Sequence, residues 1–127
     1  MEHKAIETTV WSPSPQEHFT GTVWNSRLSE VDGGATVIAV QFAPGARSDW
    51  HSHPTGQVLS VVSGAGLVQT DDGTTVQISP GDVVYAPPGE RHWHGAGPDS
   101  PMMHLSLTTQ GATEWEGKVS DKEYRRR

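Results

Sequence analysis

Three histidines and one glutamine lie at spacings that suit a bound metal ion. His51 and His53 form an i, i+2 pair, which places both imidazoles on one face of an extended segment. Gln57 follows four residues later, and His92 comes just after the turn Pro87-Pro88-Gly89. Three imidazole nitrogens and one amide oxygen from separate strands predict a divalent metal site with open coordination positions. On its own, a His-x-His pair is more often a solvated loop than a metal site, so the residues around it decide the interpretation.

These four side chains lie within two patterns that glycine and proline bound. The first is Gly45-x5-His51-x-His53-x3-Gln57-x6-Gly64, and the second is Gly81-x5-Pro87-x-Gly89-x2-His92. Together they resemble the two motifs of the cupin superfamily, over about residues 36–109. The resemblance implies an all-β fold, a small antiparallel β-barrel or jelly roll, with the metal inside its mouth.

Two positions depart from the usual cupin pattern. Gln57 stands where most metal cupins carry Glu, and Ala96 stands where the second motif often ends in Asn. Replacing the carboxylate by an amide leaves a divalent ion its full +2 charge, which makes it a stronger Lewis acid for an alkoxide, hydroxide or cyanide. The less charged ligand set also favours the reduced, divalent state, which speaks against ordinary cupin dioxygenase chemistry.

Longer stretches are similar to one subgroup of cupins. They are Phe19-Thr20-Gly21-Thr22-Val23, Pro44-Gly45-Ala46-Arg47, His51-x-His53-Pro54-x-Gly56-Gln57, Pro80-Gly81-Asp82-Val83-Val84 and His92-Trp93-His94-Gly95. In this order they resemble the small bacterial manganese cupins that include (R)-selective hydroxynitrile lyases, in which Gln also replaces Glu. The resemblance implies Mn²⁺ held by His51, His53, Gln57 and His92, although by ligand type alone Fe²⁺, Ni²⁺, Co²⁺ or Zn²⁺ fits equally well.

The resemblance implies an enzyme that cleaves or forms cyanohydrins, with a cyanohydrin, or an aldehyde plus cyanide, as substrate. His104 matches the further site histidine of the subgroup and is the candidate general base, because imidazole titrates near the working pH. The alternative for His104 is a hydrogen-bonded core residue. His94, two residues after His92, shares its face in an extended segment and is either a site residue or structural.

Four further residues are predicted to form the substrate pocket. Alternation directs Ile38 and Val40 towards the pocket, and Thr108 is the small polar residue expected opposite them. Trp50 flanks a ligand histidine and is placed at the pocket wall, with core packing as its alternative. Such a lining suits an aryl or alkyl aldehyde, and it offers no polar groups to bind a sugar or a nucleotide.

Two other function classes remain open at this point. Metal cupins also include dioxygenases and isomerases, and an Fe²⁺ or Ni²⁺ ion at this site would be able to activate O₂. The third interpretation is a non-catalytic domain that senses a small ligand. Metal-dependent oxygen uptake would distinguish a dioxygenase from a lyase. Ligand binding without turnover would identify a sensing domain.

Short Val-rich segments between turns supply the elements that position these residues. Six segments are typical of strands: 36–42, 57–63, 66–70, 74–78, 82–86 and 102–109. Asp71-Asp72-Gly73 between two of them is a strong hairpin signal. Near the end, Ser120 and Glu123 form a capping pattern that predicts a short helix. We therefore predict one cupin domain over 1–127, with an N-terminal arm (1–18), a barrel core (36–109) and a C-terminal tail (110–127).

Composition excludes several partners. The 127 residues include nine Lys and Arg against fifteen Asp and Glu, a net charge of −6 with His neutral. This sign argues against nucleic-acid and anionic-membrane binding. The chain has no cysteine and no apolar run near the roughly 20 residues of a membrane span. Its start lacks a signal-peptide pattern, so a cytoplasmic location is expected. A small barrel leaves edge strands that need covering, which favours a homodimer.

Overall fold

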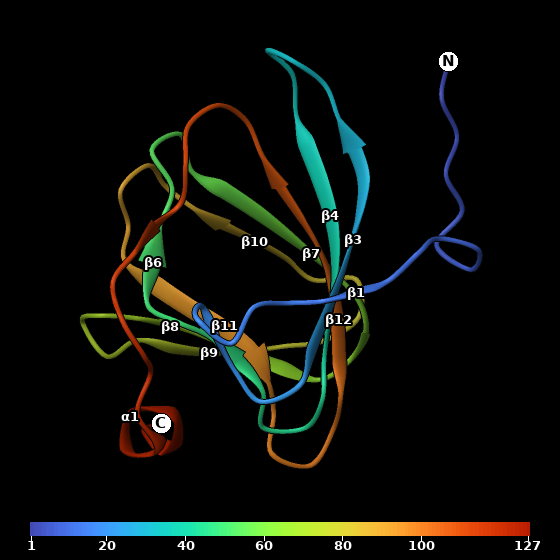
Figure 1. Cartoon of the computed structure of the whole chain (residues 1–127). Coiled ribbons are helices and arrows are strands. Elements are labelled where there is room, and N and C mark those ends of the chain that lie inside the picture. Colours follow the sequence, from blue (N-terminus) through green and yellow to red (C-terminus); the bar gives the residue numbers. More distant parts are fainter.

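The computed structural model describes residues 1–127 as two β-sheets that face each other, with one short helix near the C-terminus (Figure 1). The first half of the chain forms β1 (Ser12–Pro13), β2 (Phe19–Thr20), β3 (Val23–Glu30), β4 (Thr36–Phe42), β5 (Arg47–Ser48), β6 (His51–Ser52) and β7 (Gln57–Gly64). The second half forms β8 (Gly66–Thr70), β9 (Thr75–Ile78), β10 (Val83–Ala86), β11 (His92–Ala96), β12 (Met102–Thr108), β13 (Glu114–Trp115) and α1 (Asp121–Arg125).

Every strand pair in the two sheets is antiparallel. The first sheet has the order β1-β3-β4-β12-β7-β10 and contains the long strands. The second sheet follows the path β13-β6-β11-β5-β2, and β8 joins it by pairing with β11 and β9. Strands far apart in the sequence, such as β4 and β12, are therefore neighbours, which makes most of the strand pairing non-local.

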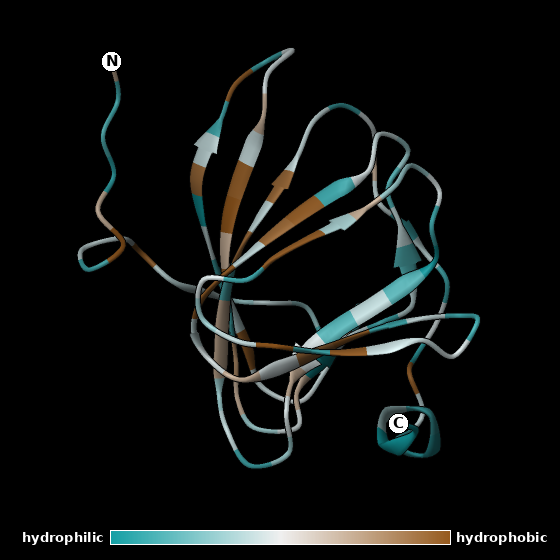
Figure 2. Cartoon of the chain, turned by 180° about the vertical axis from the view of Figure 1, so that it is seen from behind, coloured by the Kyte–Doolittle hydropathy of each residue, from teal (hydrophilic) through white to brown (hydrophobic).

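The apolar core lies between the sheets because side chains alternate along each strand. Its buried members come from both sheets: Val23, Val40, Phe42, Ala46, Leu59, Val61, Val68, Ile78, Ala96 and Met102. Hydrophobic stretches follow the strands of the first sheet, whereas β11 is hydrophilic over much of its length (Figure 2). A buried strand that is hydrophilic must place its polar side chains against something other than an apolar core.

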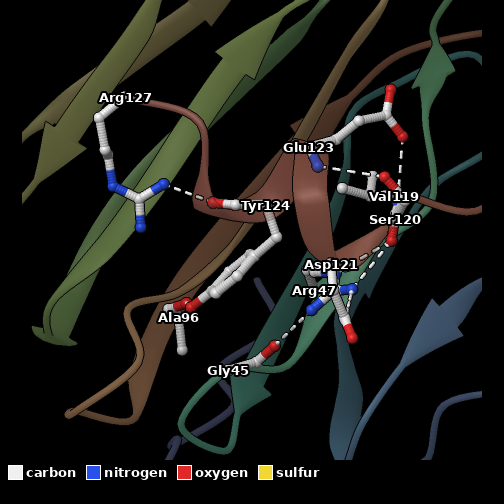
Figure 3. Close-up of polar contacts among 9 residues, drawn as sticks. All are labelled: Gly45, Arg47, Ala96, Val119, Ser120, Asp121, Glu123, Tyr124 and Arg127. Atoms are coloured by element: carbon white, nitrogen blue, oxygen red, sulfur yellow. Dashed lines mark hydrogen bonds and ion pairs between the residues drawn. The ribbon is translucent and has the colours of Figure 1, made fainter.

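The C-terminal helix is fixed to the outside of the second sheet. Ser120 and Glu123 form a capping box at its start, as the sequence pattern predicts. The Tyr124 hydroxyl donates to a carbonyl oxygen of β11 at 2.7 Å, and Arg47 pairs with Asp121 at 2.8 Å (Figure 3). No helix in the structure has the length and apolar character needed to cross a membrane.

The predicted fold class is confirmed: the chain is an antiparallel β-barrel of the jelly-roll type with a short C-terminal helix. The six predicted strands occur within one or two residues of their expected bounds. Strand β3 (Val23–Glu30) was not predicted, because most of its residues are polar and no long apolar run marks it. Strand β11 was not predicted either, because histidines occupy positions where strands usually carry apolar residues.

Candidate metal centre and cavity

Three histidines from two parts of the chain meet inside the barrel. His51 lies on β6 and His53 just after it, while His92 begins β11. Strands β6 and β11 pair with His51 opposite His92, which brings the distant motifs together. One nitrogen from each ring lies within 4.8 Å of the others, and all three residues are buried. This arrangement suits a metal ion with imidazole ligands.

Backbone carbonyl groups orient two of these rings. His51 Nδ1 donates to the Asp49 carbonyl oxygen at 2.8 Å, and His92 Nδ1 donates to the Glu90 carbonyl oxygen at 2.9 Å. A carbonyl oxygen only accepts, so each Nδ1 carries the proton and each Nε2 keeps its lone pair. An outer hydrogen bond that fixes the tautomer in this way is typical of metal-binding histidines.

Burial keeps the three rings neutral. Burial, together with the charge that His92 carries when protonated, lowers the pKa of His51 to about 3 and that of His53 to about 4. The pKa of His92 is also lowered, mainly by burial. Neutral imidazole is the form that binds a metal ion, so the site is ready for one at pH 7.

Gln57, on the first sheet, lies beside the three histidines as a further candidate ligand. Its Nε2 donates to Ser106 Oγ at 2.7 Å, which turns Oε1 towards His92 Nε2 at 3.0 Å. Both of these facing atoms are acceptors, and the buried Nε2 of His53 has no hydrogen-bond partner. A cation among the three atoms resolves the repulsion and satisfies the orphaned nitrogen. The residues present therefore fit a divalent metal ion.

A second pair of histidines lies beside the triad. His94 on β11 and His104 on β12 are buried and share a hydrogen bond of 3.0 Å between His94 Nδ1 and His104 Nε2. Burial lowers the pKa of His104 to about 4, and burial together with the charge on protonated His104 lowers the pKa of His94 well below its ordinary value. One proton lies in this hydrogen bond. Of the two outer nitrogens, His94 Nε2 and His104 Nδ1, one therefore carries a proton and the other a lone pair, in either tautomer.

One glycine allows β11 to place these rings. Gly95 lies opposite Arg47 on β5, and a Cβ at Gly95 would lie 2.5 Å from the Ala46 carbonyl oxygen. Any other residue would push β11 away from β5. The close approach of these two strands fixes β11, and with it the adjacent His94, beside β5 within the second sheet.

The histidines open into a cavity of about 410 Å³ between the two sheets. Among the candidate ligands, His51, His53 and Gln57 border it, and both members of the second pair, His94 and His104, do so as well. The pocket residues predicted by alternation, Ile38, Val40 and Thr108, line the same cavity. The structure thus gathers most of the predicted site residues around one space.

Two expectations about this cavity are wrong. Trp50 does not border it but packs in a separate apolar cluster with Leu67, Trp93, Val119 and Tyr124. It precedes His51 directly, so in extended backbone its side chain points to the opposite face. The lining is also less apolar than expected, since only five of its nineteen residues are hydrophobic.

Several lining residues were not predicted from the sequence. Asn25 and Arg27 reach the cavity from β3, and His18 stacks on Trp115 at 4.1 Å where both border it. Trp115 also lies 5.1 Å from the His51 ring. Once β3 is recognised as a strand, alternation places Asn25 and Arg27 on the same face as Val23, and this pattern could have predicted both as lining residues.

Comparisons with known proteins agree with this geometry. The model of the family described as "Cupin domain" matches residues 38–108. The "(R)-mandelonitrile lyase" of Granulicella tundricola is 42% identical over 131 residues, which cover 99% of this chain and 100% of that protein. The crystal structure of a cupin-like protein from Thermotoga maritima is 41% identical, with a TM-score of 0.89 and 96% of each chain covered.

A more distant structure shares the fold alone. The polyketide cyclase RemF from Streptomyces resistomycificus has a TM-score of 0.74 at 18% identity, over 98% of this chain and 90% of its own.

Proposed function

The chain belongs to the cupin family, and we propose that it is a metal-dependent hydroxynitrile lyase, which cleaves or forms cyanohydrins. One observation carries the proposal: a single cavity is bordered both by ligands that fit a divalent metal and by a neutral histidine pair able to exchange a proton. The identity with a mandelonitrile lyase over the full chain supports this choice of reaction.

His51, His53, Gln57 and His92 are the residues that would hold the metal, which we propose to be Mn²⁺. When bound, the ion supplies positive charge that stabilises the negative charge developing during cleavage. Its protein ligands are all neutral, so none of that charge is cancelled within the ligand set. The Gln57 amide, oriented by Ser106, contributes an oxygen where a carboxylate would contribute a charge.

The His94–His104 pair is the proposed proton acceptor. The lone pair at one outer nitrogen takes the hydroxyl proton of the cyanohydrin, and the C–O bond becomes the aldehyde carbonyl. The C–C bond to the nitrile breaks with its electron pair, which leaves on cyanide. The imidazolium then gives the proton to cyanide, so aldehyde and hydrogen cyanide are released and the pair returns to its starting state. Ile38 and Val40 supply the apolar wall for the aldehyde substituent.

The test is aldehyde release from racemic mandelonitrile, with metal-free protein and protein reloaded with Mn²⁺, against the rate in buffer. We expect rapid release only from the Mn²⁺ sample. Release no faster than in buffer, with one metal ion bound per chain, overturns the lyase proposal. Oxygen uptake by the same sample would then indicate dioxygenase chemistry at this site.

A further inference from the structure

One side chain brings a full charge to the border of the cavity. Arg27, on β3, is the single Lys or Arg in the lining, and no Asp or Glu accompanies it there. The remaining polar lining residues are hydroxyl, amide and imidazole side chains, and burial holds the imidazoles of the metal site neutral. The cavity thus carries a positive group, Arg27, although the chain as a whole has a net charge of −6.

The strand register places Arg27 at a defined distance from the metal site. Arg27 lies opposite Ile38 on β4, and Ile38 lies opposite Ser106 on β12. Ser106 in turn accepts the hydrogen bond that orients Gln57. Neighbouring strands are about 4.8 Å apart, so the Arg27 backbone lies roughly 10 Å across the sheet from Ser106. One row of residues thus leads from a candidate metal ligand to the guanidinium.

The guanidinium is available to a ligand. Its partner in the structure is Glu30, at 3.5 Å, and both side chains are well exposed, at 59% and 63%. An exposed ion pair of this kind contributes little free energy, so a ligand carboxylate can replace Glu30. The register of β3 against β4 shifts between Arg27 and Ser29, a bulge that changes the direction of the strand beside Arg27.

Positive charge continues outwards from Arg27. A second hollow shares Asn25 and Arg27 with the cavity and is bordered by Lys4 from the N-terminal segment. Asn25 Nδ2 donates to Ser14 Oγ at 2.8 Å, which holds the N-terminal segment against β3 at this point. A ligand that extends past Ile38 therefore meets two cations, Arg27 and Lys4, among mostly polar side chains.

We infer that the cavity selects substrates bearing a carboxylate at the end remote from the reacting carbon, and that Arg27 binds this carboxylate. The inference rests on the proposed function, because it names the substrate class of the same site. The substrate is then a carboxylated cyanohydrin, or the matching aldehyde acid, with its reacting carbon near the histidines. A guanidinium binds a carboxylate through two parallel N–H···O bonds, which fixes the orientation as well as the affinity.

A binding experiment tests the inference without requiring turnover. Calorimetry on Mn²⁺-loaded protein compares 4-formylbenzoate with 4-methylbenzaldehyde, which has a similar shape and no charge. We expect the acid to bind about five- to tenfold more tightly to the native protein. Arg27→Gln abolishes this preference and Arg27→Lys keeps part of it. Arg125→Gln, a control that removes the same charge from the exposed end of α1, leaves it intact.

Two results overturn the inference. Equal affinities of the native protein for the two aldehydes mean that the cavity does not select an anion. A preference for the acid that persists in Arg27→Gln means that another group, such as the metal ion, binds the carboxylate.

Kinetics separate this inference from the proposed function. The measured quantity is the ratio of kcat/KM for the 4-carboxy and 4-methyl derivatives of mandelonitrile, which we expect to fall to about one in Arg27→Gln through a higher KM for the acid. Cleavage of both with no dependence on Arg27 overturns the inference and leaves the lyase proposal standing. An Arg27-dependent binding preference without cleavage of either supports the inference and overturns the lyase proposal.

Discussion

The two faces of β11 bury side chains of opposite kinds. One face of β11 carries His92 and His94. Around these two histidines, three buried nitrogens have no hydrogen-bond partner: His53 Nε2, His94 Nε2 and His104 Nδ1. Towards α1, Trp93 is fully buried, and its Nε1 donates to Gln69 Oε1 at 3.0 Å. In the apolar cluster around Trp93, Trp50 Nε1 is the one side-chain nitrogen without a partner.

The difference separates a candidate binding site from structural packing. An unpartnered buried polar atom costs free energy, and a fold does not gather several of them unless a ligand satisfies them. The outer face gains its stability from burial of large apolar side chains and from satisfied hydrogen bonds. Changes on the cavity face should therefore affect metal and rate, whereas changes on the outer face should affect the free energy of unfolding.

The largest effect is expected from His53→Ala. The variant loses a candidate ligand whose buried Nε2 has no hydrogen-bond partner in the structure, so it should bind no metal and show no cyanohydrin cleavage above buffer. Metal per chain and aldehyde release are the measurements. His3→Ala, which alters an exposed histidine of the N-terminal arm, is the control. Full activity in metal-free His53→Ala protein would contradict the proposed mechanism.

Trp93→Ala tests the outer face. Removing a fully buried indole should lower the free energy of unfolding by about 3–5 kcal/mol, measured by urea titration. Below its transition the folded variant should still bind one metal ion per chain. Val76→Ala, at a half-exposed position, should change stability by less than about 0.5 kcal/mol. Loss of the metal from folded Trp93→Ala protein would mean that the two faces are not independent.

His104→Ala should separate rate from metal content. The variant keeps all four candidate ligands, so the metal should remain, while the loss of the proton acceptor lowers kcat by about 100-fold. Metal analysis and mandelonitrile kinetics on the same preparation provide the comparison. Equal metal content with an unchanged rate would make His104 a structural residue.

The smallest expected effect is the change in the free energy of unfolding that each histidine contributes per pH unit. His51, His53 and His104 have lowered pKa values in the folded state. Below about pH 6.5 these histidines therefore bind protons in the unfolded chain but stay neutral in the folded chain. Stability of the metal-free protein should therefore fall as pH falls from 6.5 towards 4, by about 1 kcal/mol per histidine in the first unit. Urea midpoints at several pH values measure this. His53→Ala should flatten the dependence, and an unchanged slope would contradict the assignment.

Local pattern predicted the strands that carry an apolar run and the turns between them. The run at 36–42 became β4, and the segments on either side of Asp71-Asp72-Gly73 became β8 and β9, because alternation and turn chemistry act within a few residues. The Ser120 capping pattern likewise fixed the start of α1. Strand β3 escaped prediction because Asn25 and Arg27 face a polar cavity where a core strand would show apolar residues.

The sequence by itself determined which residues are able to bind a metal, through their types and their spacing within each motif. Only the tertiary structure decided what lies next to them. Pairing of β6 with β11 set His51 beside His92, and pairing of β4 with β3 and β12 brought Arg27 into the same cavity. Side-chain alternation is a property of neighbouring residues, whereas the choice of partner strand depends on the packing of the whole barrel.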